Sequence, residues 1–226
     1  FIEAGAYDYI HKSAPAGLVE KKLRHCVDRR SATPALPAAA SELHEGIPPA
    51  LLKLFHDNPA VTQLGDLVSI HAGATPRRAW SRRQAPPDDE WRGVVTARAI
   101  DRFHAGRPTE YLLWSRLHLF RVPHPSEYSV PEKVLLSRSG PPLKAAVDKS
   151  RLPAGTDVYS LIPGEGVSAG YIACLLNSRV LDFYFNRLSG AADGRLRIEA
   201  IRETPVPRPD TSAAQELAKI ASLLSH

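Results

Sequence analysis

A stretch of low-complexity sequence near the N-terminus divides this chain into two unequal parts. Residues 31–40 are almost all alanine, proline, serine and threonine, a composition typical of a linker. We therefore expect a short unit at residues 1–30, a linker with a short helix (50–55) at 31–61, and a large unit at 62–226. With 226 residues, 43% of them hydrophobic, the chain can form one large domain plus a fragment.

The N-terminal unit carries the pattern of a strand followed by a helix. Residues 9–11 are expected to end a short strand, and Pro15 suits the first turn of a helix. The helix would bury one apolar stripe, formed by Val19, Leu23, Cys26 and Val27.

From Gln63 onward, short strand patterns alternate with loops rich in arginine and proline. Residues 68–71 alternate apolar and polar side chains, which predicts a half-buried strand that ends at Gly73. Further strands are expected at 93–96, 111–113, 133–137 and 157–162.

The last third of the chain has helical patterns. Ser168 is expected to cap a helix that runs to Leu176, and Asn177 and Ser178 mark a break before a second helix. That helix is expected to bury one face, formed by Val180, Phe183, Tyr184 and Leu188. We expect no regular structure around Pro205, Pro207 and Pro209. A capping box at Ser212 and Gln215 then predicts a final helix that buries Leu217, Ile220, Ala221 and Leu224.

The positive charge is confined to the larger unit. Residues 1–61 hold seven Lys/Arg and seven Asp/Glu, whereas residues 62–226 hold 22 and 17, which accounts for the whole net charge of +5. Eighteen of these 22 cations are arginine, whose planar fork fits phosphates and the guanine edge. A GC-rich genome also favours arginine codons, so charge alone does not establish nucleic-acid binding.

The segment from Glu3 to Lys12 reads E-A-G-A-Y-D-Y-I-H-K. It resembles the last strand region of response-regulator receiver domains, in which an aromatic switch residue lies three positions before a lysine that pairs with the acyl phosphate. Tyr9 and Lys12 match those positions, although Ser13 and Ala14 stand where the family usually has proline. The family's phosphorylated aspartate and acidic pair lie upstream of the matching segment. The fragment by itself is therefore not expected to act as a phosphate switch.

Four segments of the larger unit occur in an order known from one family. They read LGDLVSIHAG at 64–73, KVLLSRSG at 133–140, GYIACLLNS at 170–178 and TPVPR at 204–208. Together they resemble the TaqI-like C-terminal specificity domain of adenine methyltransferases and, less closely, type I restriction specificity subunits. The resemblance implies an α+β target-recognition domain with a curved mixed β-sheet plus helices. It also implies sequence-specific recognition of double-stranded DNA without catalysis, beside a methyltransferase or restriction subunit.

DNA recognition needs cations for phosphates and hydrogen-bonding forks for bases. Three basic loops are candidates: one around Trp80, one at 137–149 in which Gly140 permits an unusual backbone angle, and one at 190–197. The alternative for each is an ordinary solvated loop. The candidate DNA-binding residues are Arg77, Arg78, Arg82, Arg83, Arg138, Lys144, Lys149, Arg195 and Arg197.

Other chemistry has weaker support. Residues 164–169 match a G-x-G-x-x-A dinucleotide motif but lack the second strand that ends in an acidic residue. Residues 57–60 read D-N-P-A and lack the second proline and the aromatic residue of the catalytic loop of adenine methyltransferases. We therefore expect no enzymatic activity, no cofactor and no metal site.

Localisation follows from absent signals. No charged-then-apolar leader and no apolar run of about 18 residues is present. Cys26 and Cys174 lie far apart and are expected to be reduced, so we expect a cytoplasmic protein without membrane association. A chain that opens at Phe1 and lacks methionine is expected to begin inside a longer protein. The alternative functions are a truncated response-regulator-type signalling protein with a DNA-binding or other effector domain, and a standalone enzyme.

Overall fold

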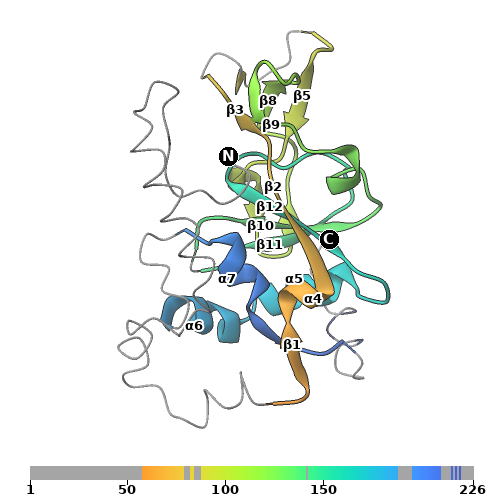
Figure 1. Ribbon diagram of the computed structural model, residues 1–226, viewed down its shortest axis with the longest axis vertical. Coiled ribbons are helices and arrows are strands. Elements are labelled where there is room, and N and C mark those ends of the chain that lie inside the picture. The colour runs from red at the N-terminus through yellow and green to blue at the C-terminus, as the bar shows by residue number, and fades with distance from the viewer. Residues whose placement is uncertain are drawn as a thin grey trace, which may run out of the picture. The chain divides into compact units, whose positions relative to one another are not determined.

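The computed structural model describes residues 58–78, 82–83, 88–140, 142–187 and 195–209, together with Gln215, Leu217 and Lys219 (Figure 1). The predictions for residues 1–30, for the linker at 31–40 and for the helix at 50–55 lie outside these residues. No helix within the described ranges is long and apolar enough to cross a membrane.

A four-stranded sheet in the order β11-β10-β12-β2 forms the centre of the fold (Figure 1). Its strands are β2 (Val68–Ala72), β10 (Lys133–Ser137), β11 (Ala145–Asp148) and β12 (Val158–Pro163). All neighbouring strands in this sheet are antiparallel, and the parallel pairing among the described residues is confined to two isolated bridges. The predicted α+β class is confirmed, as are the strands expected at 68–71, 133–137 and 157–162.

Strand β10 is buried on both faces, and its alternate side chains enter two different apolar clusters. Val134 and Leu136 pack with the helices in the larger cluster, whereas Leu135 packs in a smaller cluster with Val95 and Ile100. Because both faces are covered, β10 has a continuous apolar run instead of alternating apolar and polar residues.

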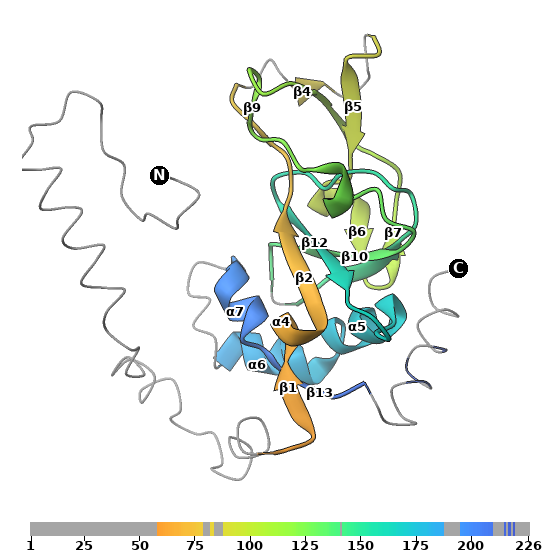
Figure 2. The same cartoon turned by 45° about the vertical axis from the view of Figure 1, so that its right-hand side comes forward.

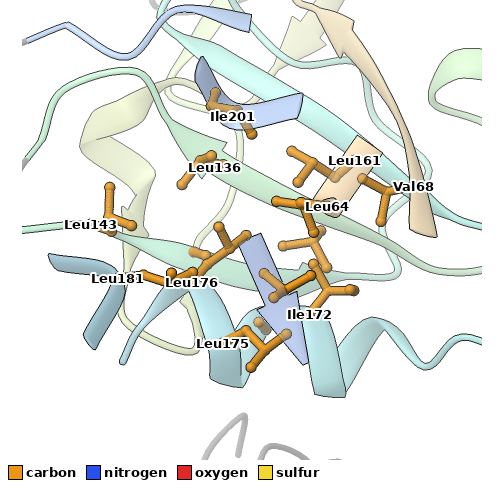
Figure 3. Packing of buried hydrophobic residues seen from close by; sticks show 14 of the residues in the cluster. Leu64, Val68, Leu136, Leu143, Leu161, Ile172, Leu175, Leu176, Leu181 and Ile201 are labelled. Carbon is orange, nitrogen blue, oxygen red and sulfur yellow. The ribbon is translucent and has the colours of Figure 1, made fainter. Parts of the chain in front are cut away.

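Helices cover one face of this sheet. They are α4 (Leu64–Leu67), α5 (Ala169–Leu176), α6 (Arg179–Arg187) and α7 (Ile198–Arg202). Figure 3 shows Leu64, Ile172 and Leu176 from the helices close to Leu136 and Leu161 of the sheet. The predicted start and end of α5 are confirmed, although the Ser168 side chain makes no capping hydrogen bond.

The break between α5 and α6 is confirmed, and it also fixes an edge strand. The buried Asn177 side chain accepts from the Ala145 N–H at 3.0 Å and donates to the Ala145 carbonyl at 2.7 Å. The Asn177 side chain thus satisfies the buried Ala145 N–H. The Ala145 carbonyl also accepts from the Phe103 N–H at 2.9 Å. The Ser178 hydroxyl accepts from the Leu181 N–H at 3.2 Å, which caps the first turn of α6.

The predicted buried face of α6 is wrong in part. Tyr184 is buried as expected, but Val180 is 58% exposed and Phe183 is 38% exposed. The core instead receives Leu181, Tyr184 and Phe185, a set with i, i+3, i+4 spacing. The expected stripe contained Val180 and Phe183 at that same spacing, so the sequence did not distinguish the two faces.

Regular structure is present around the alternating prolines, which corrects the expectation for this segment. Strand β13 (Pro205–Pro207) pairs antiparallel with β1 (Val61–Gln63). The Thr204 carbonyl accepts from the Leu64 N–H, and the Arg208 N–H donates to the Ala60 carbonyl. Even-numbered residues therefore face β1, and the prolines at odd positions are not required to donate to the ladder.

A second group of short strands lies beyond the central sheet, in the chain between β2 and β10 (Figure 2). Its members are β3 (Thr75–Pro76), β4 (Arg82–Arg83), β5 (Trp91–Val94), β8 (Glu110–Leu113) and β9 (Leu119–Arg121). We call these five strands the distal region and the central sheet with its helices the base. The strand expected at 111–113 is confirmed, and the one expected at 93–96 ends at Val94.

Smaller elements complete the described fold. The 3-10 helices η2 (Ala97–Ala99) and η3 (Pro125–Glu127) and the two-stranded pair β6 (Ile100–Asp101) and β7 (His104–Ala105) connect the larger elements. Of the expected final helix, only Gln215, Leu217 and Lys219 are described, and they are helical. The thiol of Cys174 donates to the Leu217 carbonyl at 3.1 Å.

Candidate nucleic-acid interface

The first predicted basic loop is partly a strand. Arg77 and Arg78 follow β3, and Arg78 is exposed. Arg82 and Arg83 form β4, which pairs with β8 and thus lies in the three-stranded sheet of the distal region. Trp80 lies outside the described residues. The structure therefore places all four predicted arginines in the distal region, although only part of the segment is a loop.

Arg77 is held over an aromatic ring. Its guanidinium carbon lies 4.8 Å from the centroid of the Phe120 ring, and its Nε donates to the Arg116 carbonyl at 3.4 Å. Its backbone N–H donates to the His118 carbonyl at 2.8 Å. These contacts fix Arg77 beside the turn between β8 and β9, a neighbourhood that the sequence analysis did not identify.

Arg138 is only partly exposed, and its side chain packs against the fold. Its guanidinium carbon lies 5.1 Å from the centroid of the Tyr159 ring, and one terminal nitrogen donates to the Thr156 carbonyl at 3.1 Å. The Nε atom is buried without a hydrogen-bond partner. Arg138 therefore makes contacts within the fold, and its role as a DNA contact stays a prediction.

The second predicted loop is interrupted by a strand. Lys144 and Lys149 lie on either side of β11, so they do not share one loop. Lys144 pairs with Asp101 at 3.5 Å and Lys149 pairs with Glu132 at 2.9 Å, and all four side chains are well exposed. Gly140 does not use the unusual backbone angle that glycine permits, since its φ is not positive. A Cβ at Gly140 would meet Leu143 Cδ2 at 3.2 Å, so close packing is the observed reason for glycine there.

The third predicted segment lies beside the Arg138 loop. Arg195 forms an isolated antiparallel bridge with Ser139, and the Leu196 N–H donates to the Arg138 carbonyl at 2.9 Å. Arg195 and Arg197 are exposed on either side of the buried Leu196, and Arg197 precedes α7. The structure thus brings the 138–139 and 195–197 segments together, away from the distal arginines.

A polar network that the sequence analysis missed joins the base to the distal region. The fully buried Lys133 ammonium pairs with the Asp148 carboxylate and donates to the Tyr128 carbonyl at 3.1 Å. Arg92 donates to the Tyr128 hydroxyl at 2.5 Å, and its guanidinium carbon lies 5.0 Å from the centroid of the Trp114 ring. The sequence offered one signal for this network, the lysine at the start of the apolar run 133–136. A cation buried in such a strand must be paired, so an acidic partner could have been expected.

Two open hollows lie on the described surface. One of about 440 Å³ adjoins Arg92 and Trp114 in the distal region, and one of about 540 Å³ lies between α4, β2 and the turn after β12. His71 borders the second hollow, 3.9 Å from the Glu127 carboxylate. Burial lowers the pKa of His71, the Glu127 charge opposes this effect, and Arg121 adds to it.

The structure supports neither the dinucleotide motif at 164–169 nor the methyltransferase-like motif at 57–60. The 164–169 turn follows β12, whose neighbours are both antiparallel, whereas a dinucleotide fold requires a parallel sheet. The Asn58 side chain accepts from the Ala60 N–H at 3.0 Å, which is a local turn contact. Within the described ranges, no group of three or more His, Cys, Asp or Glu side chains could hold a metal ion.

Solved structures of restriction–modification proteins resemble this chain. They include a structure reported for complex assembly and conformational transition of the type I R-M system (15% identity, TM-score 0.49, 92% of this chain and 49% of that one). They also include the HsdS subunit from Thermoanaerobacter tengcongensis (12%, 0.46, 97% and 57%) and the type I S subunit from M. genitalium (14%, 0.44, 92% and 51%). The chain spans about half the length of these structures. No curated protein matches it.

A family model matches a continuous part of the chain. The TaqI-like C-terminal specificity domain matches residues 94–206, from the end of β5 to β13. The match includes the segments around Lys144, Lys149 and Arg195, but it does not include the arginines at 77–83. It also does not reach residues 1–30, where the receiver-like fragment stays a prediction. Because the match covers half of the chain, this protein belongs to the family of TaqI-like C-terminal specificity domains.

Proposed function

We propose that residues 62–226 recognise double-stranded DNA by base sequence and direct a restriction or adenine methyltransferase assembly to its target. The observation that carries this proposal is the match of residues 94–206 to a specificity-domain family. In that role the chain selects the site, and a separate subunit supplies the methyl-transfer or cleavage chemistry.

The placement of the exposed cations supports DNA binding. Arg78 in the distal region and Arg195 and Arg197 beside α7 are all exposed, so phosphates can reach them. The ion pairs of Lys144 and Lys149 are also exposed, and such pairs are worth at most about 1 kcal/mol. Both lysines can therefore exchange their carboxylate partners for phosphates at small cost.

Selection from a pool of randomised duplexes by the purified full chain, at about physiological salt, tests this function. Enrichment of one short motif is expected. Retention of every sequence, lost when salt is raised, would reduce the function to nonspecific binding by a basic surface. Enrichment of no duplex, alone or with a catalytic subunit present, would contradict the proposal.

We also infer that the chain binds a methyltransferase or restriction subunit, which supplies the chemistry. The chain itself would need no cofactor and transfer no methyl group, and it would act in the cytoplasm. Capture of candidate catalytic subunits by the immobilised chain tests the partner. Incubation with labelled S-adenosylmethionine and duplex DNA tests the chemistry, and methyl incorporation by the chain alone would contradict this inference.

A further inference from the structure

Large apolar side chains are exposed at both ends of the described structure. Leu117 is 82% exposed and Phe120 is 62% exposed, and both lie at the distal region, in β9 or the turn before it. The other two, Val180 and Phe183, are on α6 at the far end of the base (Figure 2). Leu117 and Phe120 both lie within residues 117–120, which we call the distal ridge.

Phe120 lies at an irregularity in strand pairing. Thr75 pairs with Arg121 and Pro76 pairs with Leu119, so Phe120 has no partner residue on β3. Its neighbour Leu119 is 1% exposed and packs in the distal cluster. A bulge of this kind changes the direction of one side chain, and bulges concentrate near functional sites.

Leu117 is carried by a hydrogen-bonded turn. The Ser115 carbonyl accepts from the N–H groups of His118 and Leu119 at 3.1 and 3.0 Å, and the Ser115 hydroxyl lies 2.8 Å from His118 Nδ1. The His118 carbonyl is bound by the Arg77 N–H from the neighbouring segment. The ridge is therefore held in position before any ligand binds, which lowers the entropy lost on binding.

Arginines flank the ridge. Arg77 lies over the Phe120 ring, and Arg78 and Arg116 are exposed in segments 75–78 and 114–121, which contain no Asp or Glu. Acidic side chains lie close by as well, since Asp89 and Glu90 line a hollow together with His118. An apolar ridge edged by arginines complements a ligand that combines aromatic faces with negative charge. Nucleic acid has this combination, because stacked bases lie between two rows of phosphates.

We propose that the distal ridge is a wedge that inserts at a base step of the bound duplex, with Phe120 stacking on a base and the flanking arginines contacting phosphates. This inference rests on the proposed function and adds a deformation step to it. Recognition would then depend partly on how easily the target sequence unstacks, at positions that no hydrogen bond reads.

Binding and base unstacking by matched variants of the full chain test the wedge. The ligand is the duplex enriched in the selection above, with 2-aminopurine placed at one position at a time. Phe120→Ala removes the ring, Phe120→Tyr keeps it, and Phe183→Ala removes a ring from the exposed face of α6 as the control. A melting curve for each variant checks the fold.

Phe120→Ala is expected to weaken binding about 5- to 150-fold, the range typical of losing one base–aromatic stack. The dependence on salt should stay unchanged, because the phosphate contacts remain. Wild type, Phe120→Tyr and Phe183→Ala should raise 2-aminopurine fluorescence at one step, and Phe120→Ala should not.

Equal binding and fluorescence for Phe120→Ala and wild type would overturn the wedge while leaving the proposed function intact. Loss of subunit capture with unchanged DNA binding in Phe120→Ala would also overturn it and make the ridge a protein-docking site. Enrichment of no duplex by the wild-type chain would refute the proposed function, and the wedge would fall with it.

Discussion

The base and the distal region are held together by different interactions. Among the residues that the structure describes, twenty buried residues form one cluster between the sheet and the helices of the base, whereas the distal cluster has four. Arginine contacts supplement the distal cluster: Arg77 packs on Phe120, Arg92 packs on Trp114, and Arg121 binds the Ala72 carbonyl and Glu127. The difference indicates that the base supplies most of the stability, so the distal surface can vary with little effect on folding.

The largest expected effect is at the junction of the two regions. Lys133→Met leaves the Asp148 carboxylate buried without its cation and the Tyr128 carbonyl without a donor. Removing one partner of a buried ion pair lowers the free energy of unfolding by about 3–5 kcal/mol. Urea denaturation followed by circular dichroism measures this loss, and tryptophan fluorescence reports on the distal region, where Trp91 and Trp114 lie.

The double variant Lys133→Met/Asp148→Leu is the control for the buried charge. Removing both charges together leaves neither unpaired, so most of the lost stability should return. A double variant no more stable than Lys133→Met would show that packing, and not the unpaired carboxylate, determines the loss.

A matched pair of leucine truncations tests the comparison directly. Leu136→Ala removes a side chain from the twenty-residue cluster and is expected to lower the free energy of unfolding by about 2–5 kcal/mol. Leu112→Ala, in the four-residue cluster, is expected to fall at the lower end of that range, since fewer groups surround the cavity. Denaturation curves measure both. Equal losses would show that the distal region unfolds with the base as one unit.

Replacing a surface arginine should weaken DNA binding and leave the stability of the fold almost unchanged. Arg78→Ala is expected to weaken DNA binding modestly, by about 1 kcal/mol for one phosphate contact, and to lower the slope of log K against log salt by about 0.9. Stability should stay within about 0.5 kcal/mol of wild type, as is usual for surface changes. Binding titrations at several salt concentrations measure the slope, and an unchanged slope would remove Arg78 from the interface.

Much of the base was predictable because its patterns are local. The apolar run of β10 and the helix from Ala169 to Leu176 gave their bounds from neighbouring residues alone. Strand β13 was missed because proline lacks a backbone N–H, which argues against a strand. That loss matters only at positions whose N–H would face the partner strand, and the sequence does not show which positions these are. The buried face of α6 was wrong because two faces had the same apolar spacing.

The candidate interface was predictable in composition but not in detail. The arginines were visible in the sequence, yet only the tertiary structure shows that Arg138 binds the Thr156 carbonyl and that Arg77 covers Phe120. Phe120 also lies at an unpaired position in β9, which no local pattern marks. Side chains that contact distant segments therefore set the limit of prediction from sequence.

The smallest expected effect is a pH dependence at His71, in the strand that leads from the base toward the distal region. Burial lowers the pKa of His71 below its ordinary value of 6.5, despite Glu127, and Arg121 adds to this effect. Since the folded protein resists protonation, the stabilising contribution of neutral His71 is present above pH 6.5. It is lost as the pH falls toward the lowered value. Melting temperatures between pH 7.5 and 5.0 should decline in wild type by at most about 3 °C more than in His71→Gln. Identical declines in the two proteins would assign the pH dependence to groups other than His71.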